Sequence, residues 1–247
     1  MTLAEEISNW IAERVKEAKA EGVVFGLSGG VDSACVAVLC QRVLGNNALG
    51  LILPYHSQPE DVKYADLVAE KFGIKTVRVV LANIYDDFLG RLPKSSNLVR
   101  GNLKPRLRMA TLYYFANLHN YLVVGTGNKS ELTVGYFTKY GDGAADILPL
   151  GGLLKTDVRK LARELDIPEE IIKRMPSAGL WDNQTDEGEL GLSYEELDKT
   201  ILAIETNNLQ SVSPEILRRV KDLIQGSNHK REPIPIFKKP RKIYNHR

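Results

Sequence analysis

The sequence predicts an α/β protein in which a doubly wound parallel sheet of five strands carries helices on both faces. Apolar runs of strand length alternate with segments of helical periodicity, and this order is typical of a parallel sheet. The best-defined unit is an apolar strand, a glycine turn and a helix, all within residues 23–43. The chain has 247 residues of ordinary composition, enough for a large core, and we expect residues 1–247 to form a single domain.

The first elements follow from local patterns. Thr2-x-x-Glu5 is a capping box, and apolar residues at helical spacing follow it, so an amphipathic helix leads into the sheet. Residues 23–27 are apolar with two valines at the start, which predicts a buried strand. Residues 34–43 contain helix formers and no breaker, and residues 48–53 are a second apolar strand.

The later elements continue the alternation. We expect helices at 59–72, 104–120 and 156–165, and strands at 76–81, 121–124 and 147–150. Two polar segments interrupt this order, residues 83–103 and residues 176–192. Polar loops of that length usually move or bind a ligand. Capping signals at Ser193 and Ser213 predict two further helices near the end of the chain.

The turn after the first strand is suited to a phosphate. Gly29 and Gly30 remove the side chains that would block close approach, and the helix that follows directs its positive end into the turn. Ser28 and Ser33 can add hydroxyl donors. A carboxylate beside a phosphate repels it unless a cation lies between them, so we expect Asp32 to be a Mg²⁺ ligand.

This turn has neither the lysine of a Walker A loop nor the Gly-x-Gly-x-x-Gly pattern. Its six residues, Ser-Gly-Gly-Val-Asp-Ser at 28–33, resemble the pyrophosphate loop of the N-type ATP pyrophosphatases, Ser-Gly-Gly-x-Asp-Ser. Those enzymes cut ATP between the α and β phosphates, and the loop holds the departing pyrophosphate. The resemblance implies an adenine nucleotide alpha hydrolase-like fold and ATP contacts from Gly26, Leu27, Ser28, Gly29, Gly30, Val31, Asp32 and Ser33.

A phosphate loop without lysine leaves most of the triphosphate charge to be neutralised by Mg²⁺ and by basic residues elsewhere. Glu131 follows the glycine turn of the fourth strand and could be a second carboxylate on Mg²⁺, opposite Asp32. Lys155 lies just past the fifth strand and could reach the phosphates. Taken singly, Glu131 and Lys155 would also fit ordinary surface charges. Ser28 and Thr126 both follow strands at their carboxyl ends, where open α/β sheets bind ligands.

Longer motifs in the second half of the chain resemble those of NAD⁺ synthetases, and the resemblance runs from about residue 23 to about residue 231. The motifs are Gly125-Thr126-Gly127-Asn128-Lys129-Ser130-Glu131, the segment Gly-Tyr-Phe-Thr-Lys-Tyr-Gly-Asp-Gly-Ala-Ala-Asp at 135–146, Leu154-Lys155, Pro176-Ser177-Ala178-Gly179-Leu180, Asp-Glu-Gly-Glu-Leu-Gly at 186–191 and His229-Lys230. That family makes NAD⁺ from nicotinic acid adenine dinucleotide (deamido-NAD), ATP and ammonia, and it releases AMP and pyrophosphate.

The resemblance implies a role for each matching residue. Thr126, Lys155 and Ser177 would join the loop in binding ATP, and Asp32 and Glu131 would hold Mg²⁺. Contacts to deamido-NAD are expected from Arg106, Lys139, Asp146, His229 and Lys230, with Arg108 as the competing choice for Arg106. The catalytic set would be Asp32, Lys155 and Asp142. Asp142 could be the base or the ammonium site, or simply a turn residue between two glycines.

Composition limits the partners. The net charge of +2 does not indicate a nucleic-acid binder, and no apolar run approaches the length of a membrane span. The charged N-terminus argues against a signal peptide, and we expect a cytoplasmic protein. By resemblance, we expect a homodimer acting on small molecules.

The nitrogen source is expected to be ammonia. Cys35 and Cys40 lie five positions apart on the helix after the loop and read as buried thiols. Glutamine-dependent relatives carry an amidase domain with a nucleophilic cysteine, and the roughly 22 residues before the first strand cannot hold one.

Two alternatives stay open at the level of sequence. One is another member of the pyrophosphatase group, such as a GMP synthetase, an asparagine synthetase or a tRNA-thiolating enzyme. The other is a non-catalytic ATP-binding module of the same fold, which would not need Glu131 opposite Asp32. Incubation with ATP and candidate acceptors, followed by detection of AMP, separates these possibilities.

Overall fold

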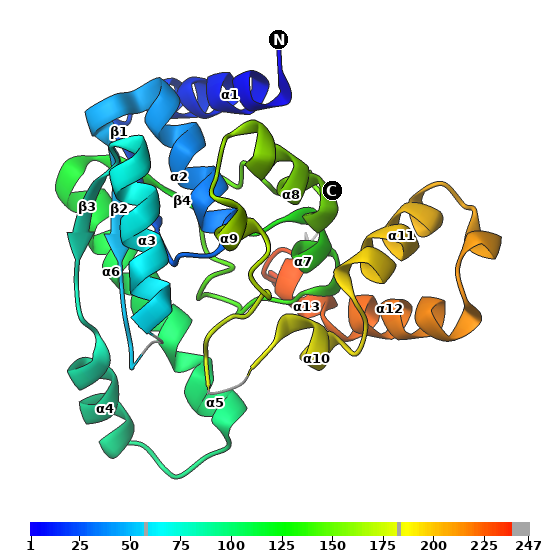
Figure 1. Cartoon of the computed structure of the whole chain (residues 1–247). Helices are drawn as coiled ribbons and strands as arrows, with labels where there is room; N and C mark the ends of the chain where they lie inside the picture. Colours follow the sequence, from blue (N-terminus) through cyan, green and yellow to red (C-terminus); the bar gives the residue numbers. More distant parts are fainter. Residues whose placement is uncertain (57–58, 182–183, 239–247) are drawn as a thin grey trace, which may run out of the picture.

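The computed structural model describes residues 1–56, 59–181 and 184–238 (Figure 1). Its centre is a parallel sheet with the strand order β3-β2-β1-β4. The strands are β1 (Gly22–Gly26), β2 (Ala48–Ile52), β3 (Lys75–Arg78) and β4 (Tyr121–Val124). Each is joined to the next by a connection containing at least one helix, as the sequence predicts.

The described part of the sheet has four strands, and the expected fifth strand at 147–150 is wrong as a strand. Ile147 forms a single parallel bridge with Val124, and the chain then turns away. Pro149 has no N–H to give to a ladder, and the chain folds back on itself, with Gly151 N–H donating to the carbonyl of Leu148. The neighbouring part of the β4 edge is occupied instead by the side chain of Asp146, which accepts a bond from the main chain.

Helices cover both faces of the sheet, as expected for a doubly wound fold (Figure 1). On one face pack α1 (Leu3–Glu17), α2 (Val31–Leu44), α3 (Pro59–Phe72) and α8 (Lys155–Glu164). On the other face lie α4 (Ala82–Gly90) and α6 (Leu103–His119). The strand alternation explains the division, because Val23 and Phe25 of β1 join the first core cluster and Val24 joins the second.

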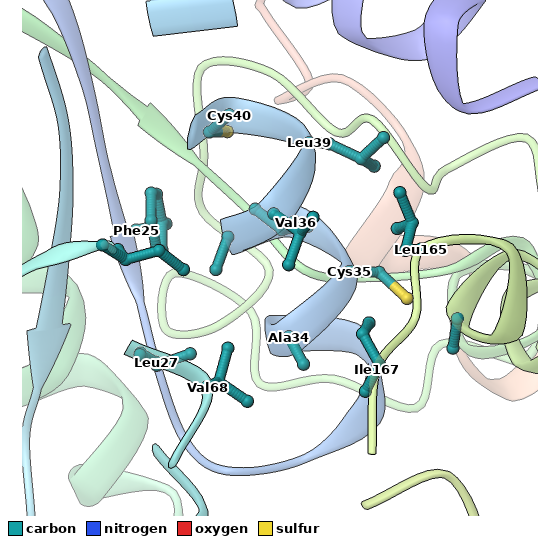
Figure 2. Close-up of a cluster of buried hydrophobic side chains, with 14 of the residues drawn as sticks. Phe25, Leu27, Ala34, Cys35, Val36, Leu39, Cys40, Val68, Leu165 and Ile167 are labelled. Atoms are coloured by element: carbon teal, nitrogen blue, oxygen red, sulfur yellow. The ribbon is translucent and has the colours of Figure 1, made fainter. Parts of the chain in front are cut away.

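The core under α2 contains both cysteines (Figure 2). Phe25 from β1 and Leu165 and Ile167 from the segment after α8 pack in the same cluster as Cys35 and Cys40. Neither cysteine is exposed to solvent, which confirms that they are buried thiols.

A second group of helices packs around a third core cluster beyond the sheet. It includes α7 (Lys129–Val134), α11 (Tyr194–Glu205) and α12 (Pro214–Gly226), and α11 and α12 lie side by side (Figure 1). The short helices are α5 (Asn97–Gly101), α9 (Glu169–Ile172), α10 (Asp186–Leu190) and α13 (Asn228–Arg231). None of the described helices has the length and apolarity needed to cross a membrane.

Local signals located several elements well. The predicted helix 59–72 and strand 121–124 agree with the structure at both ends. The capping boxes at Thr2 and Ser193 are both formed. One boundary matters for function: the helix expected from residue 34 begins three residues earlier, at Val31, so the second half of the phosphate loop lies in its first turn.

Candidate active site at the carboxyl ends of β1 and β4

The loop after β1 is held by its own hydroxyl groups. Ser33 Oγ donates to the carbonyl of Gly30 at 2.9 Å and accepts from Ser28 N at 3.2 Å. Gly29 has φ +81°, and a Cβ there would lie 2.4 Å from the carbonyl oxygen of Asp61. Only glycine fits this conformation and this contact, so α3 packs directly against the loop.

Residues from three distant segments meet beside this loop. The side chain of Lys155 is 2% exposed, and its ammonium forms an ion pair with Asp32 and lies 3.3 Å from Glu131 Oε1. Asn128 Nδ2 donates to Asp32 Oδ1 at 3.0 Å. The ring of Tyr194 lies beside the same ammonium, with 5.0 Å between Nζ and the ring centroid. The structure therefore brings Asp32, Glu131 and Lys155 into one cluster.

Helix starts explain why these side chains converge. Asp32 lies in the first turn of α2, after β1. Glu131 lies in the first turn of α7, after β4, where it forms a capping box with Asn128. Lys155 is the first residue of α8. Because β1 and β4 are parallel neighbours, the turns that follow them lie at the same edge of the sheet.

Burial and charge set the protonation of the cluster. Burial raises the pKa of Glu131 from 4.5 to about 7, because the nearby Lys155 ammonium only partly offsets the cost of desolvation. Burial by itself would lower the pKa of Lys155, but Asp32 and Glu131 together raise it, so Lys155 remains charged. Burial also raises the pKa of Asp186. One ammonium thus offsets several carboxyl groups in a largely buried space.

The polar segment 176–192 is tied to this cluster through two tyrosines. Tyr194 Oη lies 3.0 Å from Asp186 Oδ2 and 3.3 Å from Glu131 Oε1. Tyr136 Oη lies within hydrogen-bond distance of two carboxylates of this segment. It can donate to Asp186 Oδ1 at 3.1 Å or to Glu189 Oε2 at 2.6 Å. The hydroxyl of Ser177 donates within the same segment, to the carbonyl of Gln184 at 2.7 Å.

The two long polar segments touch each other. Lys104, which directly follows the segment 83–103, donates from Nζ to the carbonyl of Leu180 at 2.7 Å. A Cβ on Gly101 would lie 3.1 Å from side-chain atoms of both Leu180 and Trp181. Segments that the sequence separates by some 80 positions therefore form one wall near the strand ends.

A small cavity of about 40 Å³ lies between the turn after β4 and residues 135–146, which we call the glycine-rich segment. Its lining includes Thr126, Glu131, Phe137 and Asp142. Asp142 accepts a bond from Thr138 N at 2.9 Å, and burial raises the pKa of its carboxyl group. Asp142 thus has the local bond of a turn residue and also faces a cavity beside Glu131, so both expectations for it remain compatible with the structure.

Four of the basic residues expected to contact the dinucleotide lie together. Arg106 Nη2 donates to the carbonyl of Lys139 at 3.3 Å, and the ammonium of Lys139 donates to the carbonyl of His229. Lys230 Nζ donates to the carbonyls of residues 135 and 137 at 2.7 and 2.9 Å. These contacts gather α6, the glycine-rich segment and α13 around one basic surface.

Asp146 and Arg108 lie in different surroundings. Asp146 accepts from Val123 N at 2.7 Å and from Tyr113 Oη at 3.1 Å, so its carboxylate holds the edge of β4. The guanidinium of Arg108 stacks on Tyr55 at 4.9 Å and donates from Nε to the carbonyl of residue 53 at 3.1 Å. Arg106, in contrast to Arg108, is exposed to solvent.

Sequence reasoning did not single out Asn128, Tyr136, Tyr194 or Asp186 as members of the site. A signal existed for Asn128, because Asn-x-x-Glu before a helix is a capping box and Glu131 was already a candidate. Tyr136 and Asp186 lie in the quoted motifs at 135–146 and 186–191, but no local pattern gives their roles. Those roles, and that of Tyr194, depend on how the second group of helices packs against α7 and α8.

Comparison with known proteins identifies the family of this chain. A sequence profile of the family described as NAD synthase matches residues 3–234. The NH(3)-dependent NAD(+) synthetase of Finegoldia magna is 44% identical over 243 residues, which are 98% of this chain and 98% of that protein. An NMN synthetase structure from Francisella tularensis is similar with a TM-score of 0.88 and 38% identity, over 95% of this chain and 96% of that chain. An NH3-dependent NAD synthetase from Campylobacter jejuni, in complex with the nitrate ion, is similar with a TM-score of 0.85 and 32% identity, over 96% of this chain and 97% of that chain. The chain therefore belongs to the NAD synthase family.

Proposed function

We propose that this protein is an ammonia-dependent NAD⁺ synthetase. It converts deamido-NAD, ATP and ammonia into NAD⁺, AMP and pyrophosphate. The observation that carries the proposal is the buried cluster of Asp32, Lys155 and Glu131 next to the pyrophosphate loop. Membership of the NAD synthase family supports this reaction over those of the other ATP pyrophosphatases.

Asp32 and Glu131 fit a Mg²⁺ site. Both direct a carboxylate oxygen at the same cation in this structure, the Lys155 ammonium. Among the residues that the structure describes, no group of three or more histidine, cysteine or acidic side chains is arranged to hold a metal. Two carboxylates with further oxygens from phosphate and water are typical of Mg²⁺ sites. When bound, Mg²⁺ would neutralise charge on the departing pyrophosphate.

The first step requires activation of the nicotinate carboxylate, because ammonia cannot displace oxide from it. The carboxylate attacks the α-phosphorus of ATP, and pyrophosphate leaves to give an acyl adenylate. Residues 26–33 hold the pyrophosphate, with Ser28 and Ser33 already ordered by mutual bonding. Lys155 offsets negative charge at the transferring phosphate, and Thr126 and Ser177 contribute hydroxyl contacts to ATP.

In the second step, ammonia attacks the carbonyl of the adenylate and AMP leaves. Ammonium must first lose a proton, and we assign this role to Asp142. Its carboxyl group has a raised pKa and lines a cavity of about 40 Å³, which has room for a molecule the size of ammonia or water.

The dinucleotide is expected to contact Arg106, Lys139, His229 and Lys230. These four residues lie on one basic surface, which suits a ligand with a pyrophosphate bridge. Asp146 would contribute through a hydrogen bond that it does not now make, since it is engaged at the β4 edge. We further propose that the protein acts as a homodimer in the cytoplasm.

The deciding experiment is turnover with defined acceptors. Purified protein with ATP, MgCl₂ and ammonium chloride should form AMP and NAD⁺ in equal amounts when deamido-NAD is present. Nicotinic acid mononucleotide is the alternative acceptor to be tested beside deamido-NAD, because one structural relative is named an NMN synthetase. AMP formation with the mononucleotide and none with deamido-NAD would overturn the proposed substrate. If no AMP forms with either acceptor, the proposed reaction is wrong.

A further inference from the structure

The first N–H groups of α8 receive their hydrogen-bond acceptors from other helices. The N-cap residue of α8, Leu154, has no side-chain acceptor. Lys155 N donates instead to Ser130 Oγ at 2.9 Å, and Thr156 N donates to Asp198 Oδ2 at 2.8 Å. Free N–H groups at a buried helix start need such partners, so α8 depends on these two side chains.

Ser130 and Asp198 are themselves joined and buried. The hydroxyl of Ser130 donates to Asp198 Oδ1 while it accepts from Lys155 N. Ser130 is 0% exposed and Asp198 is 3% exposed. A carboxylate at a helix start also interacts favourably with the helix dipole. We call these two side chains, together with the N–H groups of Lys155 and Thr156 that donate to them, the Asp198–Ser130 bridge.

The position of this bridge connects it with the chemistry. Ser130 directly precedes Glu131 on α7, and Thr156 directly follows Lys155 on α8. The bridge therefore fixes the main chain next to both members of the Lys155–Glu131 ion pair. Asp198 lies on α11, and Tyr194 lies one turn before it on the same helix. The ring of Tyr194 lies beside the Lys155 ammonium.

We propose that Asp198 and Ser130 are positioning residues that set where the Lys155 ammonium stands relative to Glu131 and the transferring phosphate. The inference rests on the proposed function, because it concerns the same site. Its physical basis is that a displacement of about 1 Å in a reacting group can cost roughly 100-fold in rate. Neither residue is expected to touch ATP or the dinucleotide, since both are buried where α7, α8 and α11 meet.

The test uses Asp198→Asn and Ser130→Ala, with Thr200→Val as the matched control. Thr200 is also buried on α11, and among the described residues its hydroxyl bonds only within its own helix, to the carbonyl of Glu196 at 2.7 Å. Each of the first two variants should lower kcat by about 30- to 100-fold while KM for ATP and deamido-NAD stays within about threefold. Thr200→Val should lower thermal stability without lowering kcat.

Hydrogen exchange provides a readout that does not depend on turnover. Peptides containing the start of α8 should exchange faster in Asp198→Asn and Ser130→Ala and at the normal rate in Thr200→Val. The variant that combines Asp198→Asn with Ser130→Ala should have a kcat no lower than that of the less active single variant, because both substitutions disrupt the same Asp198–Ser130 bridge. If Asp198→Asn does not fold, Ser130→Ala, which keeps the carboxylate, carries the test.

Several outcomes would overturn the inference. One is a kcat within about threefold of wild type in folded Ser130→Ala and Asp198→Asn. Another is an equal loss of kcat in Thr200→Val, which would indicate a general effect of weakening α11. Inactivity of the wild-type protein would instead contradict the proposed function, and exchange at the start of α8 would still show whether the bridge holds that helix.

Discussion

The Lys155 ammonium pairs with the Asp32 carboxylate in a buried position, although the two residues are 123 positions apart in the chain. Without substrates, this one ammonium partly offsets the charge of both Asp32 and Glu131, and burial raises the pKa of Glu131 to about 7. A buried ammonium without a partner is costly, so the two carboxylates also stabilise Lys155 in place. Substrate binding then has to redistribute contacts that the free protein already makes. This arrangement leads to the predictions that follow.

Asp32→Asn and Glu131→Gln should each reduce Mg²⁺-dependent AMP formation by at least about 100-fold, as expected for loss of one electrostatic partner at a reacting phosphate. The fold should persist, because Lys155 keeps its other carboxylate partner. AMP release across a MgCl₂ series is the measurement. Asp66→Asn is the control, since Asp66 forms an exposed ion pair with Arg78 of β3. Near-normal turnover at low Mg²⁺ in either site variant would remove that residue from the metal site.

Glu131→Gln should also flatten the pH dependence of stability. The pKa of Glu131 is about 7 in the folded protein against 4.5 without burial, so the folded state binds more protons between these values. The free energy of unfolding contributed by this group is therefore most favourable below pH 4.5 and is lost as the pH rises through about 7. Urea unfolding without ligands at several pH values tests this. Parallel plots of the free energy of unfolding against pH for the wild type and the variant would contradict this prediction. The pKa of Asp186 is also raised, but Asp186 is present in both proteins and therefore does not cause a difference between them.

The pure protein should use ammonium and not glutamine. Burial raises the pKa of both Cys35 and Cys40, and neither thiol is exposed, so neither can act as a nucleophile on glutamine. Cys35→Ala with Cys40→Ala should keep ammonia-dependent activity at a stability cost of about 1–3 kcal/mol from lost packing. Glutamate release and NAD⁺ formation are measured with ammonia-free glutamine. Glutamate release in proportion to NAD⁺, lost in the double variant, would show that a cysteine supplies the nitrogen.

Residues 176–181 and 184–192 should become protected from hydrogen exchange when ATP and deamido-NAD bind together, and so should part of 83–103. The two segments pack against each other where Gly101 meets Leu180 and Trp181. Closure over the adenylate would exclude water from a reactive intermediate. Exchange in α1, which lies on the far side of α2, serves as the control and should not change. Unchanged exchange in both polar segments would exclude a covering role for them.

Arg106→Ala should raise KM for deamido-NAD by about 10- to 100-fold with little change in KM for ATP, the size expected for loss of a charged hydrogen bond. Arg106 is exposed on the basic surface. Arg108→Ala should instead destabilise the fold, because its guanidinium packs on Tyr55 and bonds to the main chain. Steady-state kinetics and thermal unfolding of both variants distinguish the two arginines. A dinucleotide KM defect confined to Arg108→Ala would reverse the assignment.

The sequence by itself determined the elements whose signals are local. The helix at 59–72, the strand at 121–124 and the capping boxes at Thr2 and Ser193 depend on contacts between residues a few positions apart, and the structure contains each of them. The phosphate loop was also readable, because Gly29 occupies a conformation and a space that other residues cannot. The order of strands and helices was enough to predict the layers of the fold.

Tertiary structure alone decided the features that depend on distant partners. The segment 147–150 has the composition of a strand, but Pro149 and the Asp146 side chain leave it with a single bridge to β4. Likewise, no local pattern could show that Lys155 is buried between two carboxylates or that Asp198 accepts a bond from the start of α8. The physical reason is that desolvation and hydrogen bonding of a buried polar group depend on every element packed around it, and packing brings those elements together from all parts of the chain.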